Sequence, residues 1–147
     1  MSCHRSSREG GIAFVVAETL CPYVTVKYDF SFRYSPFELV QLTASLSQHC
    51  LHDFCLYRLL PNRKNKPTDS LFIGQFPALL EYRNTVKGRL LIVGDFRFCF
   101  DTPSNTYTSR LIGLLDAFSL TQAVIASTHK QGHVLDWVLY REDDDVL

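Results

Sequence analysis

The segment from Arg89 to Arg97 constrains this chain more than any other. Its residues 90–93 are all apolar, and the absence of alternation predicts a short strand covered on both faces. Gly94-Asp95 ends the strand and sets one carboxylate at the rim of a sheet, where a metal ion or an attacking water can be held. Arg97 follows two residues later, and the side chain at this position determines whether Asp95 works in a catalytic site.

Bulk properties restrict the class of protein. The 147 residues fit one domain, and 46% hydrophobic residues suffice for a packed core. With 15 basic and 15 acidic side chains, net charge gives no argument for nucleic acid or membrane binding. The longest apolar run, residues 12–17, is too short for a membrane span or a signal-peptide core. We expect an intracellular protein, nuclear or cytoplasmic, without a membrane partner.

The five cysteines form no C-x-x-C pair. Cys50, Cys55 and Cys99 lie among apolar residues, which is typical of small buried side chains in a reducing compartment.

The first half of the chain predicts strands, and the second half mixes helices with strands. Strands are expected at 12–17, 23–28, 37–42 and 53–57, joined as an antiparallel meander. Thr68 or Asp69 begins a helix whose apolar positions 72, 76, 79 and 80 share one face, and Pro77 predicts a kink or break near Gly74. Ser104 or Asn105 caps a second helix, and strands follow at 122–125 and 134–140. This order predicts two packed sheets with helices outside.

A polar loop, residues 128–136, leads into the last strand and carries Asp136 between two apolar residues. An unpaired buried carboxylate is costly, so Asp136 is either a capping or edge residue or a carboxylate that orients a histidine. His129 and His133 have an H-x-x-x-H spacing, but Gly132 before a strand argues against the helix that a zinc site of this kind needs.

Several motifs together resemble the endonuclease domain of LINE-type (non-LTR) retrotransposons, a branch of the endonuclease/exonuclease/phosphatase family. They are Gly88-Arg-Leu-Leu-Ile-Val-Gly-Asp-Phe96, Leu114-Leu-Asp-Ala-Phe118, Leu120-Thr-Gln122 and Thr128-His-x-x-Gly-His-x-Leu-Asp136, with looser similarity in 10–13, 35–39 and 56–58. The resemblance runs over about residues 9–140, with 141–147 as an acidic tail. It implies an α/β (α+β type) fold, DNase I-like, in which a two-sheet β-sandwich is flanked by helices. We expect residues 1–147 to form a single incomplete domain of this type, truncated at both ends.

The resemblance also implies Mg²⁺- or Mn²⁺-dependent hydrolysis of DNA, without a small-molecule cofactor. Asp95 matches the aspartate that positions the attacking water, and Asp136 matches the aspartate that hydrogen-bonds the catalytic histidine. Tyr57 falls where the family often has an active-site tyrosine, and Thr128 and His129 fall in its substrate-side loop.

Three departures from the family pattern point to loss of catalysis. Arg97 replaces an asparagine, and a guanidinium ~4 Å from a divalent cation would repel it by roughly 8 kcal/mol at an effective dielectric constant of about 20. Arginine also cannot accept a hydrogen bond as the amide does. The family's metal-binding glutamate has no counterpart, since Glu18-Thr19 lies downstream of the Gly-Gly strand, and the closing Ser-Asp-His motif is missing. We therefore expect no intact metal site.

These observations predict a catalytically inactive fragment of an endonuclease domain. Two alternatives stay open. One is a repurposed nucleic-acid or protein binding module, in which basic residues contact phosphates, and the other is a residual Mg²⁺-dependent nuclease. The basic residues in question are Arg97, Arg58, Arg63, Lys64 and Lys66.

Overall fold

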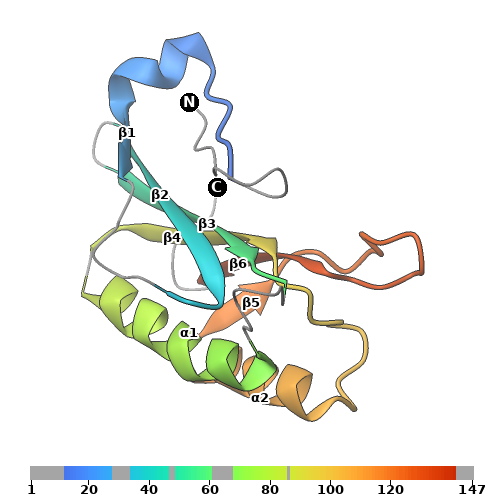
Figure 1. Cartoon of the computed structure of the whole chain (residues 1–147). Coiled ribbons are helices and arrows are strands. Elements are labelled where there is room, and N and C mark those ends of the chain that lie inside the picture. The colour runs from blue at the N-terminus through green and yellow to red at the C-terminus, as the bar shows by residue number, and fades with distance from the viewer. Residues whose placement is uncertain (1–11, 28–33, 47–48, 61–67, 86, 142–147) are drawn as a thin grey trace.

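The computed structural model describes residues 12–27, 34–46, 49–60, 68–85 and 87–141. Nine elements occur in these ranges (Figure 1). They are the 3₁₀ helix η1 (Glu18–Tyr23), β1 (Val24–Lys27), β2 (Phe37–Leu46), β3 (His49–Arg58), α1 (Asp69–Asn84), β4 (Arg89–Asp95), α2 (Thr106–Ala117), β5 (Leu120–Gln122) and β6 (Asp136–Arg141).

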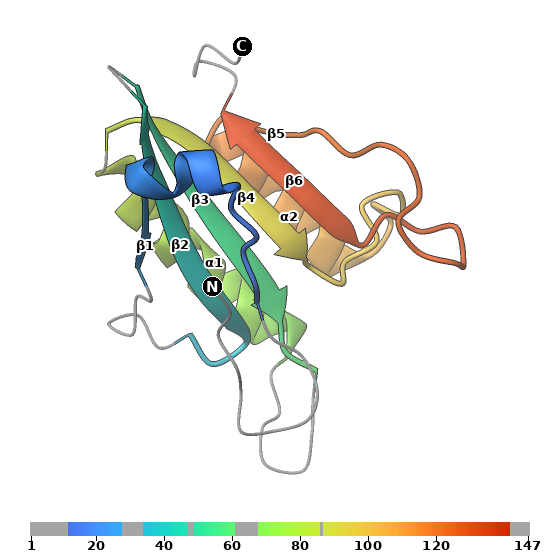
Figure 2. The same cartoon turned by 90° about the horizontal axis from the view of Figure 1, so that it is seen from above.

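The six strands form one mixed sheet in the order β1-β2-β3-β4-β6-β5. β3 and β4 are parallel and are joined through α1, whereas all other neighbours are antiparallel. Both helices lie against the same face of the sheet, as the two perpendicular views show (Figures 1 and 2). The predicted α/β class is confirmed. The described residues provide one sheet with its helices, and they do not form a second stacked sheet.

The hydrophobic core lies between the sheet and the helices. Alternate residues of β3, β4 and β6 point toward the helices and are buried, which is the period of two expected of a strand. Aromatic rings dominate this layer, and Phe96 stacks on Trp137 with ring centroids 5.0 Å apart. Its fully buried large side chains include Phe37, Phe54, Leu56, Phe72, Phe76, Leu79, Ile92, Phe96, Leu111 and Trp137.

Both helices begin where the sequence predicts. The Thr68 side chain accepts a hydrogen bond from the Leu71 amide at 3.1 Å, and Asn105 caps α2 by accepting from Tyr107 and Thr108. The expected break near Gly74 is wrong, because α1 continues through Pro77 to Asn84 as one helix. Its buried face packs on the sheet along its whole length, which compensates for the one backbone donor that proline removes.

Other strand predictions need correction. Residues 12–17 form no strand, since only Ala13 makes an isolated bridge, and Val15 is fully exposed. β2 and β3 extend to ten residues each, whereas the predicted strands at 122–125 and 134–140 become 120–122 and 136–141. β4 is not covered on both faces: Leu90 and Ile92 are buried, but Leu91 and Val93 are half-buried.

The face of β3, β4 and β6 that points away from the helices is called the open face below. On this face, register partners on β3, β4 and β6 form three rows of side chains that run across the strands. Each row has one residue from each strand, and the three rows are Asp53, Leu91 and Tyr140; Cys55, Val93 and Val138; and Tyr57, Asp95 and Asp136. On the adjoining part of this face, β2 buries Val40, Leu42 and Ala44 beneath η1 and the segment before it (Figure 2).

None of the helices in the described ranges is long and apolar enough to cross a membrane. The cysteines at 21, 50, 55 and 99 are free, and the last three are half-buried.

Candidate functional site

Three residues that the sequence singled out for catalysis lie side by side at one end of the open face. Tyr57 of β3 is the register partner of Asp95 of β4, and Asp95 is in turn the partner of Asp136 of β6. Side chains directly opposite on neighbouring strands point to the same face. We call these three residues the carboxylate row. Tyr57 and Asp95 are half-buried, and Asp136 is exposed.

Gly94 determines how closely β4 approaches β3 at this row. Its φ is +156°, and a Cβ placed there would lie 1.8 Å from the Leu56 carbonyl oxygen. No other residue fits this position without moving backbone atoms. The Gly-Asp pair therefore has a structural reason: glycine permits the close approach that brings Asp95 beside Tyr57.

Arg97 lies at the end of the carboxylate row and pairs with it. Its Nε is 3.0 Å from Asp95 Oδ2, and its guanidinium carbon is 5.8 Å from the centroid of the Tyr57 ring. The Nε–H is not directed at the carboxylate, so the contact is an ion pair without hydrogen-bond geometry. Arg97 also has a left-handed backbone with φ +55°, a conformation that asparagine adopts far more readily than arginine.

Burial raises the pKa of Asp95 above its ordinary value. The Arg97 guanidinium opposes this change, and the neighbouring Asp136 carboxylate adds to it. Asp95 Oδ1 is inaccessible to solvent and accepts no hydrogen bond from a described residue. Among the causes that lower the pKa of Asp95, the positive charge of Arg97 is the largest.

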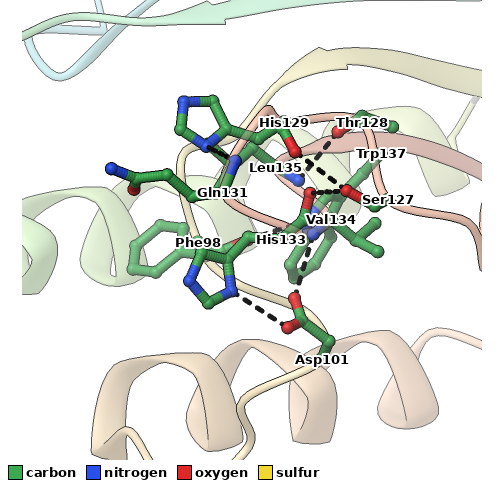
Figure 3. Close-up of polar contacts among 10 residues, drawn as sticks. All are labelled: Phe98, Asp101, Ser127, Thr128, His129, Gln131, His133, Val134, Leu135 and Trp137. Atoms are coloured by element: carbon green, nitrogen blue, oxygen red, sulfur yellow. Dashed lines mark hydrogen bonds and ion pairs between the residues drawn. The ribbon is translucent and has the colours of Figure 1, made fainter.

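The loop after β5 is held by its own hydrogen bonds (Figure 3). The Thr128 hydroxyl accepts from the amides of Leu135 and Asp136 at 3.0 and 3.1 Å, and Ser127 donates its hydroxyl to the His129 carbonyl at 2.9 Å. His129 Nδ1 accepts from the Gln131 amide at 3.3 Å. Thr128 therefore positions the start of β6, and its side chain is already engaged within the loop.

An aspartate–histidine pair lies in this region, but it does not include Asp136. Asp136 has no histidine partner among the described residues, whereas Asp101 Oδ2 lies 3.0 Å from His133 Nδ1. Asp101 Oδ1 also accepts from the Val134 amide at 2.9 Å, and these contacts lower the pKa of Asp101, the backbone hydrogen bond contributing most. Figure 3 shows both contacts on one carboxylate. The two residues lie 32 positions apart in the chain, and no sequence signal links them.

Arg58 has a structural role. Its guanidinium donates to the carbonyls of Phe96 and Arg97 at 3.3 Å each, pairs with Asp69 at the start of α1, and lies over the Phe98 ring at 4.0 Å. With its side chain only 11% exposed, it is not available to contact a phosphate. The other basic residues proposed for such contacts, at 63, 64 and 66, lie outside the described residues.

The residues of the site do not fit a divalent cation. Asp95 is already paired with a guanidinium, and Asp136 is the one other carboxylate in the row. Among the described residues, no three histidine, cysteine, aspartate or glutamate side chains converge so that they could hold a metal ion. His129 and His133 stand in a loop, not on a helix, so their spacing does not form the zinc site considered above.

A hollow of about 330 Å³ lies beside Arg97, between the loop after β4 and the starts of α1 and α2, and no residue of the carboxylate row lines it. Arg97 and His133 line it, together with Asn105 and Thr108 at the start of α2.

Comparison of the coordinates with solved structures identifies the fold. The endonuclease domain of TRAS1, a telomere-specific non-LTR retrotransposon, matches with a TM-score of 0.53 and 14% identity, over 82% of this chain and 57% of that one. A humanized D. rerio TDP2 with 14 mutations matches with a TM-score of 0.50 and 13% identity, over 76% and 47%. The chain has the endonuclease/exonuclease/phosphatase fold.

The chain spans about half the length of the solved structures it matches. A third match, an endonuclease/exonuclease/phosphatase family protein from Leptotrichia buccalis, has a TM-score of 0.44 and 12% identity, over 71% of this chain and 42% of that one. No protein-family profile and no curated protein matches the sequence.

Proposed function

We propose that this chain is an incomplete endonuclease/exonuclease/phosphatase-type domain, similar to a retrotransposon endonuclease, that does not hydrolyse phosphodiesters. The observation that carries the proposal is the ion pair between Arg97 Nε and Asp95 Oδ2 at 3.0 Å. The family resemblance assigns the Asp95 carboxylate to positioning the attacking water. Here that carboxylate is paired with an arginine side chain instead.

The electrostatics of the row support the same conclusion. A divalent ion near Asp95 would lie close to a fixed positive charge, in a half-buried site where screening by water is incomplete. Asp136 lacks a histidine partner among the described residues, so the pair that would stabilise charge developing on phosphorus is missing from this part of the fold. Loss of one such group costs orders of magnitude in rate.

A plasmid-nicking assay tests the proposal. The protein is incubated with supercoiled DNA and Mg²⁺ or Mn²⁺, and Asp95→Ala serves as the matched control. We expect equal, background nicking by both proteins. Nicking by the wild-type chain that depends on the metal and disappears in Asp95→Ala would contradict the proposal.

A nucleic-acid-binding role is the second candidate, and the partly exposed Arg97 guanidinium favours it. Two observations oppose it: Arg58 is committed to the fold, and the carboxylates of Asp95 and Asp136 would repel phosphates beside Arg97. Retention on single- or double-stranded DNA at increasing salt tests this role. Retention that falls with salt and weakens in Arg97→Ala would support binding, and equal retention of the two proteins would exclude a role for this site.

A further inference from the structure

We propose that the Arg97 guanidinium is the resident cation of the carboxylate row, so that replacing Arg97 with asparagine creates a divalent-cation site. This inference rests on the proposed function and explains it: the site is filled, and not simply incomplete. The Arg97 guanidinium thereby prevents a metal ion from binding to Asp95 and Asp136.

The row needs a positive charge whatever its source. Asp95 and Asp136 are register partners on adjacent strands, and like charges directly opposite each other in a sheet are destabilising. The inner oxygen of Asp95 is inaccessible to solvent and has no donor among the described residues, so water does not compensate this charge. Of the two arginines near Asp95, Arg58 is directed to Asp69 and to backbone carbonyls, which leaves Arg97 as the counter-ion.

The backbone at position 97 is held independently of its side chain. Arg58 donates to the carbonyls of Phe96 and Arg97, and the Phe96 amide donates to the Leu135 carbonyl at 3.0 Å. These contacts do not involve the Arg97 side chain, and φ of residue 97 is +55°, so we expect a substitution there to change the side chain and leave the loop in place. Asparagine suits this conformation better than arginine does.

Arg97→Asn therefore changes two properties of the row at once. It removes the positive charge that repels a cation, and it adds an amide oxygen, which is a suitable ligand for Mg²⁺ or Mn²⁺. Arg97→Gly keeps the left-handed backbone and removes the charge without adding a ligand. Arg97→Lys keeps the charge. Together the three variants distinguish the effect of removing the positive charge from the effect of adding a metal ligand.

Mn²⁺ binding measured by electron paramagnetic resonance tests the inference without reference to catalysis. In the full chain we expect Arg97→Asn to bind one Mn²⁺ with a Kd at least about tenfold lower than that of wild type. Arg97→Gly should bind with intermediate affinity, and Arg97→Lys should resemble wild type. Adding Asp136→Asn to Arg97→Asn should remove the gain, and circular dichroism establishes that each protein is folded.

Two results would overturn the inference. One is wild-type protein that binds Mn²⁺ as tightly as Arg97→Asn. The other is folded Arg97→Asn and Arg97→Gly that bind no more tightly than wild type. The nicking assay distinguishes the two proposals. Metal-dependent nicking by the wild-type chain contradicts the proposed function. A wild-type chain that does not nick DNA, together with variants that do not bind Mn²⁺, contradicts only the role of Arg97.

Discussion

At the scale of single residues, two positive φ angles flank Asp95 and determine its surroundings. Gly94, with φ +156°, allows β4 to approach the Leu56 carbonyl. Arg97, with φ +55°, places its guanidinium beside the Asp95 carboxylate. The sequence predicts the first feature, because Gly-Asp at the end of an apolar strand is a recognisable signal. It does not predict the second, because arginine has no preference for a left-handed backbone.

Gly94→Ala should destabilise the fold by at least about 3 kcal/mol, because the added Cβ meets the backbone of β3, which cannot move without breaking the sheet. Chemical denaturation measures the change. Gly113→Ala in α2 is the matched control, since nothing lies within 4 Å of the added atom. There we expect a gain of about 0.5–1 kcal/mol from higher helix propensity. Equal effects at the two positions would refute the steric explanation.

Asp53 gives a prediction about pH. Burial in the open face raises its pKa to about 6, and its Oδ1 accepts no hydrogen bond from a described residue. Since the folded-state pKa lies above the unfolded value of 3.8, the contribution of Asp53 to stability is fully present below about pH 4 and is lost as the pH rises through about 6.

Asp53→Asn should therefore be more stable than wild type at pH 7, by up to about 3 kcal/mol, with the difference shrinking as the pH falls to 4. Thermal unfolding of both proteins across this range checks the prediction. A stability difference that does not vary with pH, or a less stable variant at pH 7, would show that Asp53 ionises without cost in the fold.

At the scale of elements, Arg58 joins three of them: it extends from β3, pairs with the first residue of α1 and holds the carbonyls of the loop after β4. The sequence predicts the ends of both helices because caps are local signals, with Thr68 and Asn105 in the expected places. It cannot predict the Arg58 contacts, because Arg58 meets the loop 38 and 39 residues away in the chain.

Replacing Arg58 by methionine should lower the free energy of unfolding by about 2–4 kcal/mol, since it leaves two carbonyls and Asp69 without their donor. Arg110→Met, on the exposed side of α2, is the control and should change stability by less than about 0.5 kcal/mol. A loss after Arg58→Met no greater than the loss after Arg110→Met would mean that the three elements are held together by apolar packing alone.

At the scale of the whole molecule, the two faces of the sheet differ. The helices α1 and α2 cover one face, whereas neither of them lies on the open face, where Leu91, Val93 and Val138 are half-buried (Figure 2). The sequence predicts strand β4 correctly but also predicts cover on both faces. Periodicity in four residues cannot distinguish a strand covered twice from one whose second layer is missing.

The isolated chain should therefore bind the dye ANS and self-associate, since these three half-buried apolar side chains adjoin one another and apolar surface favours both. The double substitution Val93→Thr and Val138→Thr should reduce both effects, because threonine suits a strand but is more polar. Ile125→Thr, in an exposed loop off this face, should leave them unchanged. A wild-type chain that stays monomeric, unfolds cooperatively and binds no ANS would contradict this expectation.

The sequence by itself determined the α/β class, both helices with their caps, and the glycine that ends β4 beside Asp95. These features depend on local propensity and on periodicity, which neighbouring residues in the chain decide. Only the tertiary structure decided that Tyr57, Asp95 and Asp136 share one row, that Arg97 neutralises Asp95, and that His133 pairs with Asp101 and not with Asp136. Such contacts depend on strand register and on loop conformation, which bring together residues that lie far apart in the chain.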